Sequence, residues 1–180
     1  MKTCTLCREA YGYSEGIKGN NYDLKRIMLV MNRPDRRILT MTFFNDHDIA
    51  LARSQTGKIL VEILKEAELG FEDIYITNIF KCLLPGDREP TRKEYENCAK
   101  ILEEQVREFG PRKIIAFGYR TYESMLPEMA SQFDFDTMTG ATSKYKGIDT
   151  LISHHPGMIW KYPHEKRKEI YEVIKEFIKK

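Results

Sequence analysis

DIYITNIFKCLLPGDREPTRKEYENCAKILEEQVREFG, residues 73–110, predicts a strand, a turn-rich connection and a long helix in succession. Residues 73–80 form a nearly continuous apolar run, which is typical of a strand buried on both faces. Thr91 and Glu94 form a capping box, because a Thr and a Glu three residues apart can each satisfy a free backbone N–H at a helix start. We expect the helix to stop at Gly110. A strand followed by a helix is the repeating unit of an α/β protein.

The same alternation continues on both sides of this stretch. Further apolar runs that predict strands are residues 26–31, 113–117 and 150–153. Helices are expected from Ser54 to Gly70, after Gly118, and from about Pro163 to the end of the chain. Strands that alternate with helices imply a mainly parallel sheet, here of four strands, with helices on both faces.

Length and composition limit the kind of protein. A chain of 180 residues suits one domain, residues 1–180, and can bury a core without disulfides. Its net charge of +2 is too small to indicate a polyanionic partner, although the basic stretch 161–168 is either a local nucleic-acid patch or a solvated helix face. Its apolar runs are too short to cross a bilayer, and its first residues do not resemble a secretory signal. We therefore expect a cytoplasmic protein without membrane contact.

Polar residues follow the expected strands. Asn32 follows the first strand, Asn78 lies late in the second, Gly118 ends the third, and His154 and His155 follow the fourth. Open parallel sheets bind ligands at the carboxyl ends of their strands, so two amides and an imidazole should converge on one edge. Any one of them alone could be an ordinary loop or capping residue. Their joint placement is what indicates a site.

Four cysteines make a second candidate site. Cys4 and Cys7 form a C-x-x-C pair, and Cys82 and Cys98 lie far downstream. Four thiolates suit either zinc or an iron–sulfur cluster, and spacing alone does not choose between them. Two buried free thiols beside an incidental C-x-x-C pair is the third possibility.

The segment 75–98 resembles family 4 uracil-DNA glycosylases. Their pattern there is Tyr-x-Thr-Asn-x-x-Lys-Cys-x-Pro-Pro, then Asn-Arg-x-Pro, then a Glu and a Cys in a helix, and Cys98 stands at the family's distance. Residues 56–60 are similar to the family's Ala-Gly-x-x-Leu helix start, residues 113–118 to its strand ending in Leu-Gly, and residues 153–157 to its His-Pro-Ser motif. With the N-terminal C-x-x-C pair, the resemblance covers nearly the whole chain in the right order.

The resemblance implies a three-layer α/β/α sandwich with a structural [4Fe–4S] cluster near the DNA-binding surface. The cluster ligands would be Cys4, Cys7, Cys82 and Cys98. It also implies a DNA repair enzyme, a monofunctional glycosylase that acts as a monomer on single- or double-stranded DNA. Such an enzyme flips a uracil or a related deaminated base into a pocket and hydrolyses its N-glycosidic bond.

Roles follow for individual residues. The resemblance makes His155 the donor of a hydrogen bond to the leaving base, and puts Asn32 in place of the family's acidic residue, where an amide can orient a water. Asn78 would read the base through its amide donor and acceptor. The other expected substrate-binding residues are Pro34, Gly157, Phe43 and Phe44, the two phenylalanines as stacking partners. Met158, Ile159 or Trp160 would fill the space that the flipped base leaves.

Three departures from the family pattern support an alternative. Met31 and Asp35 replace family glycines, and Ala52 stands where an aromatic residue would stack on uracil. These changes favour a non-catalytic or repurposed iron–sulfur DNA-binding protein of the same fold. A zinc-containing α/β hydrolase unrelated to DNA is the third hypothesis.

Overall fold

The computed structural model of the protein describes residues 4–11, 13–34 and 54–180, which form a six-stranded sheet in the order β1-β3-β2-β4-β6-β5. The four central strands are parallel: β3 (Ile74–Asn78), β2 (Ile27–Met31), β4 (Lys113–Phe117) and β6 (Ile148–Ser153). They correspond to the four strands expected from the sequence. The register pairs Met31 with Asn78 and Phe117 with Ser153, so neighbouring strands end at the same level.

The expected strand number of four was too small, because the sheet has an antiparallel strand at each edge. β1 (Ile17–Lys18) pairs with β3, and β5 (Thr142–Tyr145) pairs with β6. No apolar run predicts β5, because its sequence TSKY is largely exposed. Lys146 and Gly147 join it to β6 with positive φ angles of 50° and 83°, as a tight hairpin turn requires.

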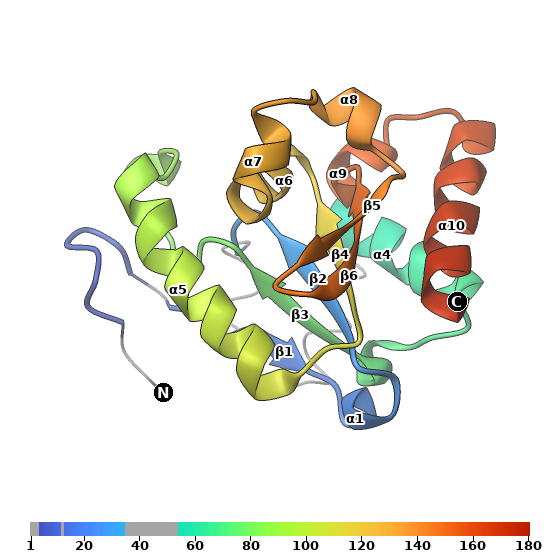
Figure 1. The fold of residues 1–180 in the computed structure, drawn as a ribbon, viewed down its shortest axis with the longest axis horizontal. Helices are drawn as coiled ribbons and strands as arrows, with labels where there is room; N and C mark the ends of the chain where they lie inside the picture. The colour runs from blue at the N-terminus through green and yellow to red at the C-terminus, as the bar shows by residue number, and fades with distance from the viewer. Residues whose placement is uncertain (1–3, 12, 35–53) are drawn as a thin grey trace.

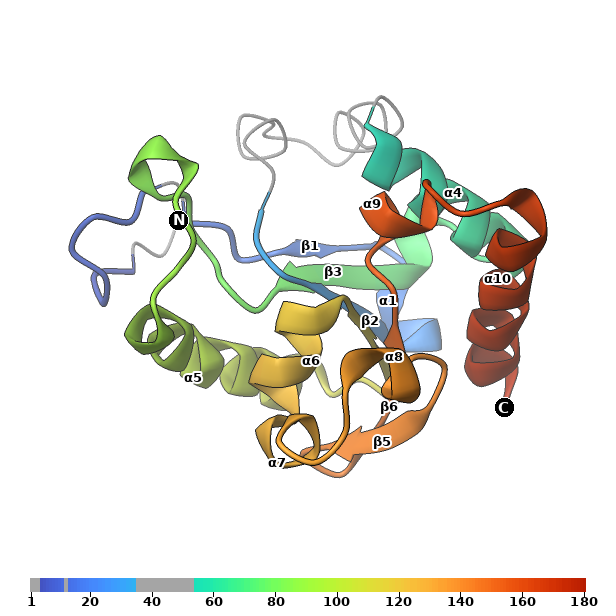
Figure 2. The ribbon, with the colours of Figure 1, turned by 90° about the horizontal axis from the view of Figure 1, so that it is seen from above.

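Helices cover both faces of the sheet (Figures 1 and 2). One face packs against α4 (Gln55–Glu66), α9 (Pro156–Ile159) and α10 (His164–Lys179). The other packs against α1 (Tyr22–Lys25), α5 (Arg92–Phe109), α6 (Tyr119–Met125), α7 (Pro127–Ala130) and α8 (Phe135–Met138). Along β2 the buried side chains alternate, with Leu29 in the first core and Met28 and Val30 in the second. The three-layer α/β/α sandwich is confirmed.

Three predicted helix-end signals are confirmed, at Ser54, Thr91 and Gly110, whereas α4 ends at Glu66, before the expected Gly70. The Ser54 hydroxyl accepts a hydrogen bond from the Gly57 N–H at 2.9 Å and caps α4. Thr91 and Glu94 form the expected capping box of α5. Gly110 ends that helix with a φ of 50°, a left-handed conformation that glycine adopts without strain.

The N-terminal segment lies beside the start of α5 (Figure 1). Tyr11 and Leu83 form an antiparallel bridge, and the Ser14 N–H donates to the Lys81 carbonyl at 2.7 Å. Two 3₁₀ turns precede the neighbouring elements, η1 (Phe71–Asp73) before β3 and η2 (Pro85–Asp87) before α5. This packing brings Cys4 and Cys7 to the side of the molecule that carries Cys82 and Cys98.

Candidate active site

The residues predicted to share a sheet edge do so. They are Asn32, Asn78, Gly118 and His155, each at or just beyond the end of a parallel strand. The Phe80 N–H donates to the Asn32 carbonyl at 2.9 Å, and the Gly118 N–H donates to the Ser153 carbonyl at 2.8 Å. These backbone bonds continue the sheet past its strand ends. In the described part of the chain no hydrogen bond joins His155 to Asn78, since β2 and β4 lie between their strands.

His155 is the N-cap of α9, and its ring is oriented by a backbone contact. The Gly157 N–H donates a hydrogen bond to Nδ1 of His155 at 3.1 Å. Burial lowers the pKa of His155, so the neutral ring dominates at pH 7. A neutral imidazole that accepts at Nδ1 carries its proton at Nε2. The ring therefore offers one N–H donor, at Nε2.

Two glycines make room for this ring. A Cβ atom at position 118 would lie 3.1 Å from Cβ of His155, and a Cβ at 157 would lie 3.2 Å from both His155 Nδ1 and Thr56 Oγ1. Sequence reasoning assigned Gly157 to the approach of a phosphate or base. The structure supplies a closer neighbour, since the absence of a side chain at 157 admits His155 and Thr56.

Asn78 carries a buried acceptor without a partner. Its side chain is 7 % exposed, and Oδ1 makes no hydrogen bond. Leaving such an atom unpaired costs about 1–3 kcal/mol, so it is expected where a ligand supplies the missing donor. This is the atom that base reading would use.

Lys81 holds the backbone of Asn78 from inside the protein, a role the sequence reasoning missed. Its ammonium group is fully buried and donates to Thr77 Oγ1 at 2.7 Å, to Gln105 Oε1 at 2.6 Å and to the Asn78 carbonyl. Burial lowers the pKa of Lys81 to about 7. A lysine directly after an apolar run was the available signal, because a buried ammonium group needs such partners.

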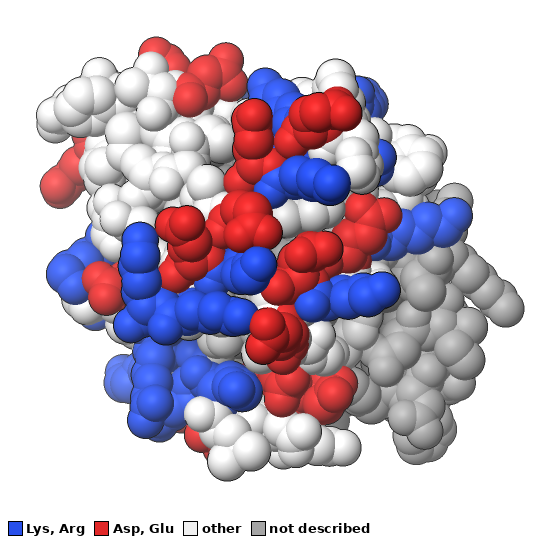
Figure 3. All heavy atoms as spheres, turned by 90° about the vertical axis from the view of Figure 1, so that its right-hand side faces the viewer, with Lys and Arg blue, Asp and Glu red and all other residues white. Residues whose placement is uncertain are grey.

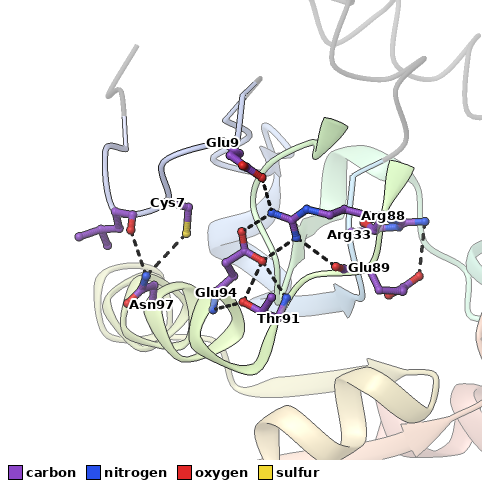
Figure 4. A network of polar contacts seen from close by, with 9 residues as sticks. Cys7, Glu9, Arg33, Arg88, Glu89, Thr91, Glu94 and Asn97 are labelled. Carbon is purple, nitrogen blue, oxygen red and sulfur yellow. Dashed lines mark hydrogen bonds and ion pairs between the residues drawn. The ribbon is translucent and has the colours of Figure 1, made fainter. Parts of the chain in front are cut away.

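Asn32 and Arg33 are fixed to the segment around the start of α5. Asn32 Oδ1 accepts a hydrogen bond from the Tyr95 hydroxyl at 2.9 Å. Arg33 donates to the carbonyls of Asp87 and Arg88, both at 3.2 Å, and pairs with Glu89 at 3.6 Å (Figure 4). Pro34, an expected substrate-binding residue, is buried beside them. Phe43 and Phe44, like Asp35 and Ala52, lie outside the described residues.

The four cysteines are free and share one region. Cys82 and Cys98 are buried with Phe80 and Leu84, while Cys4 and Cys7 are half-buried. Burial raises the pKa of Cys82 to about 12, with smaller contributions from Cys98, Cys4 and Cys7, so all four sulfurs interact electrostatically. Within the described ranges no three Cys, His, Asp or Glu side chains are assembled to hold a metal ion. The four thiols are of the right chemical type for a four-thiolate centre and lie in the same region of the molecule. In the structure they do not form the coordination geometry of such a centre.

Side chains of α5 hold the cysteine-bearing N-terminal segment (Figure 4). Asn97 Nδ2 donates to the Leu6 carbonyl at 3.1 Å and to Cys7 Sγ at 3.6 Å. Arg88 pairs with Glu94 at 2.9 Å and with Glu9 at 3.2 Å. The Arg88 guanidinium keeps the pKa of Glu94 down at about 2, so this carboxylate stays charged at neutral pH.

His154 does not share the surroundings of His155. Its ring packs edge-on against Phe135 and Tyr162, and the Tyr162 hydroxyl lies 3.3 Å from its Nδ1. It lines an open cavity of about 240 Å³ between α8, β6 and α10. The two adjacent histidines therefore form a natural pair for mutational comparison.

Of the three residues considered for the space left by a flipped base, two are available at the surface. Met158 is 46 % exposed and Trp160 is 39 % exposed. Ile159 is fully buried in the core with α4, so its assignment was wrong. A helical turn at residues 156–159 was the available signal, because in such a turn one of three consecutive side chains points into the core.

The molecular face on the side of α10 carries both signs of charge (Figure 3). Ion pairs on this side are Lys175–Glu172, Lys179–Glu68 and Lys180–Glu176. Lys and Arg side chains alternate there with Asp and Glu, so this face as a whole is not a basic surface for polyanions. Among the helices of the described chain, none is long and apolar enough to span a bilayer.

Comparison with known proteins places this arrangement in a family. The sequence model of the "Uracil DNA glycosylase superfamily" matches residues 20–179. The chain belongs to the uracil-DNA glycosylase superfamily. The match includes all four parallel strands and both ends of the proposed site, from Asn32 to His155.

Several relatives within the superfamily are named type-4 uracil-DNA glycosylases. A type-4 uracil-DNA glycosylase of Sulfurisphaera tokodaii is 25 % identical over 183 residues, which cover 97 % of this chain and 80 % of that protein. One of Archaeoglobus fulgidus is 30 % identical over 130 residues, covering 64 % and 60 %. One of Thermotoga maritima is 31 % identical over 118 residues, covering 66 % and 58 %. The last two matches span less than two thirds of those relatives' length.

Proposed function

We propose that this chain is a DNA repair glycosylase that hydrolyses the N-glycosidic bond of uracil, or of a related deaminated base, in DNA. The observation that carries the proposal is the bond from the Gly157 N–H to His155 Nδ1. It leaves a neutral ring with a single donor at Nε2, and a fixed donor stabilises a base that leaves as an anion. The superfamily match and the type-4 relatives support the same reaction.

In the proposed reaction the bond between C1′ and the base nitrogen breaks, and its electron pair moves onto the base. His155 Nε2–H donates to the carbonyl oxygen where negative charge develops. The unpaired Asn78 Oδ1 accepts the uracil N3–H, and its Nδ2 donates to the adjacent carbonyl. Cytosine has no N3–H and presents an amino group instead, so the same amide disfavours it. Water adds to C1′ and releases a proton to solvent.

We infer that Cys4, Cys7, Cys82 and Cys98 would hold a [4Fe–4S] cluster. The support is four free thiols of suitable type in one electrostatic neighbourhood, together with the resemblance. When bound, the cluster would cross-link the N-terminal segment to α5 and take no part in bond cleavage. Anaerobically purified protein should be brown and contain iron and sulfide. Colourless protein with one zinc ion per chain would contradict this assignment.

A non-catalytic iron–sulfur DNA-binding protein is the second candidate. The departures at Met31, Asp35 and Ala52 favour it. Asn32 also stands where the resemblance places an acid, and an amide cannot take a proton from water effectively at neutral pH. DNA is the partner in both readings.

We further propose that the protein acts as a monomeric domain over residues 1–180. The proposed substrate, rather than a missing membrane helix, supports the expected cytoplasmic location.

The test is uracil excision from labelled single- and double-stranded DNA, followed by alkali. Strand breaks should appear only after alkali, as for a monofunctional enzyme, and should be lost in His155→Ala. His154→Ala is the matched control, since this neighbouring ring lines the cavity between α8, β6 and α10, which His155 does not line, and it should retain activity. DNA binding without excision would favour the second candidate. Excision unaffected by His155→Ala would reject the role of His155.

A further inference from the structure

We propose that Tyr95 is a positioning residue that holds the Asn32 carboxamide by its oxygen, so that Asn32 presents an N–H donor to the site. This inference rests on the proposed function and assigns to a residue of α5 a task in that reaction. The Tyr95 hydroxyl donates to Asn32 Oδ1 at 2.9 Å. Asn32 directly follows β2, at the edge where Asn78 and His155 also lie.

Tyr95 itself is held in place. It lies in the first turn of α5, where its N–H donates to the carbonyl of the capping residue Thr91 at 3.1 Å. Its ring packs edge-to-face against Phe80, with 6.0 Å between centroids and 64° between planes. The same ring covers the buried cluster that contains Cys82 and Cys98. A hydroxyl on a fixed ring holds its partner in place better than a mobile side chain does.

Asn32 is anchored at two atoms by the same aromatic pair. Its backbone carbonyl accepts from the Phe80 N–H at 2.9 Å, while its side-chain oxygen accepts from Tyr95. The next residue, Arg33, is tied to the carbonyls of Asp87 and Arg88. The backbone of Asn32 is therefore held by Phe80, after β3, and its side chain by Tyr95, in α5.

The chemical consequence follows from the asymmetry of a carboxamide, which has one acceptor atom and one donor atom. In the observed orientation the hydroxyl donates to Oδ1; in a flipped amide Nδ2 would instead donate to the hydroxyl oxygen, and Oδ1 rather than the N–H would be left for a ligand. Among the described residues, Asn32 Nδ2 has no hydrogen-bond partner. Its N–H is left for the oxygen of a water or of DNA. A water held this way keeps a second lone pair for C1′, and its proton goes to solvent.

The test is a double-mutant cycle of Tyr95→Phe and Asn32→Ala in the holoprotein, read by steady-state kinetics of uracil excision. Tyr95→Phe keeps the ring that covers Cys82 and Cys98 and removes only the hydroxyl. We expect kcat to fall about tenfold, the effect of one lost hydrogen bond, with KM within about twofold. In Asn32→Ala, the second change should have no further effect. Equal losses in both backgrounds would overturn the inference.

A matched control and an activity-free readout separate this inference from the proposed function. Tyr171→Phe removes a hydroxyl that donates to Glu62 at 2.7 Å on the opposite face of the sheet, and should leave kcat unchanged. The side-chain amide resonances of Asn32 should shift in Tyr95→Phe and not in Tyr171→Phe, while visible absorption of the protein stays the same. Unshifted Asn32 resonances would reject the Tyr95 contact. Wild-type protein that excises no uracil, with the Asn32 shift present, would reject only the proposed function.

Discussion

Gly118 leaves no room for a side chain beside His155: a Cβ atom at position 118 would lie 3.1 Å from Cβ of His155, closer than an ordinary van der Waals contact. Gly118 has a φ of 90° and follows β4, while His155 follows the neighbouring strand β6. The Gly118 N–H also donates to the Ser153 carbonyl, two residues before the histidine. The end of one strand therefore sets the position of the imidazole carried by the next.

Gly118→Ala should displace His155 and lower uracil excision. Gly140→Ala is the control, because Gly140 has nearly the same φ, 89°, with nothing within 4 Å of an added Cβ. Both substitutions place a side chain at positive φ and should destabilise the protein by about 1–3 kcal/mol. Thermal unfolding and excision rates, measured side by side, should show similar stability losses and an activity loss in Gly118→Ala alone. Equal activities would contradict the proposed packing role.

The pH dependence should show an acid limb. Burial lowers the pKa of His155 in the folded state below the ordinary value of about 6.5. The neutral ring then contributes stability that is fully present above the unfolded pKa and is lost as the pH falls through the folded one. Protonation keeps the Nε2–H but places a second proton on Nδ1, which breaks the Gly157 contact that orients the ring, so excision should fall in the same window. Single-turnover rates that rise on acidification would exclude the neutral His155 ring as the active form.

Asn78→Leu should separate stability from function. The Asn78 Oδ1 atom is buried without a partner, so an apolar side chain of similar size removes an unsatisfied acceptor. The free energy of unfolding should stay the same or rise by about 1 kcal/mol, while uracil excision falls on the order of a hundredfold. Urea unfolding and excision assays measure the two effects. A variant that loses stability and keeps its discrimination against cytosine would argue that Asn78 is structural.

Asn32→Asp should increase the rate of excision. A carboxylate at this position can both hold a water and accept its proton, which the amide cannot do effectively. We expect a gain on the order of tenfold at neutral pH, below the full range for general-base catalysis because Tyr95 also donates to this side chain. Steady-state kinetics with uracil-containing DNA provide the measurement. An unchanged or lower rate would mean that water activation at residue 32 does not limit the reaction.

Cys98→Ser should release iron from the protein and loosen the N-terminal segment. Cys98 is buried beside Cys82, and both lie near Cys4 and Cys7. With a ligand lost, visible absorption should decrease and proteolysis before residue 15 should accelerate. Ser131→Ala, which removes an exposed hydroxyl at the end of α7 that donates to the Glu128 carbonyl, is the control. Full iron content in Cys98→Ser would remove Cys98 from the ligand set.

Much of the fold could be predicted from local sequence. The apolar runs of β2, β3, β4 and β6 and the caps at Ser54 and Thr91 rest on chemistry within a few residues. β5 escaped because an exposed TSKY strand owes its pairing to the neighbouring β6 rather than to burial. The short β1 depends in the same way on β3.

The site was predictable in its residues and less so in its contacts. Strand ends located Asn32, Asn78 and His155 on one edge, because parallel strands share a direction. The Tyr95–Asn32 bond joins residues 63 positions apart, and no local pattern specifies it. The sequence marks Lys81 only as a charged residue directly after an apolar run. Its buried role could not be predicted, because its partner Gln105 lies 24 residues away.

The most direct measurement is ¹⁵N NMR of the His155 ring at pH 7, in the free protein and with DNA that contains a non-hydrolysable uracil nucleotide. We predict one ring proton, on Nε2, in both states, and a shift of that N–H resonance when the uracil DNA binds. A doubly protonated ring, a proton on Nδ1, or an Nε2–H resonance unchanged by uracil DNA would contradict a neutral histidine that donates to the departing base.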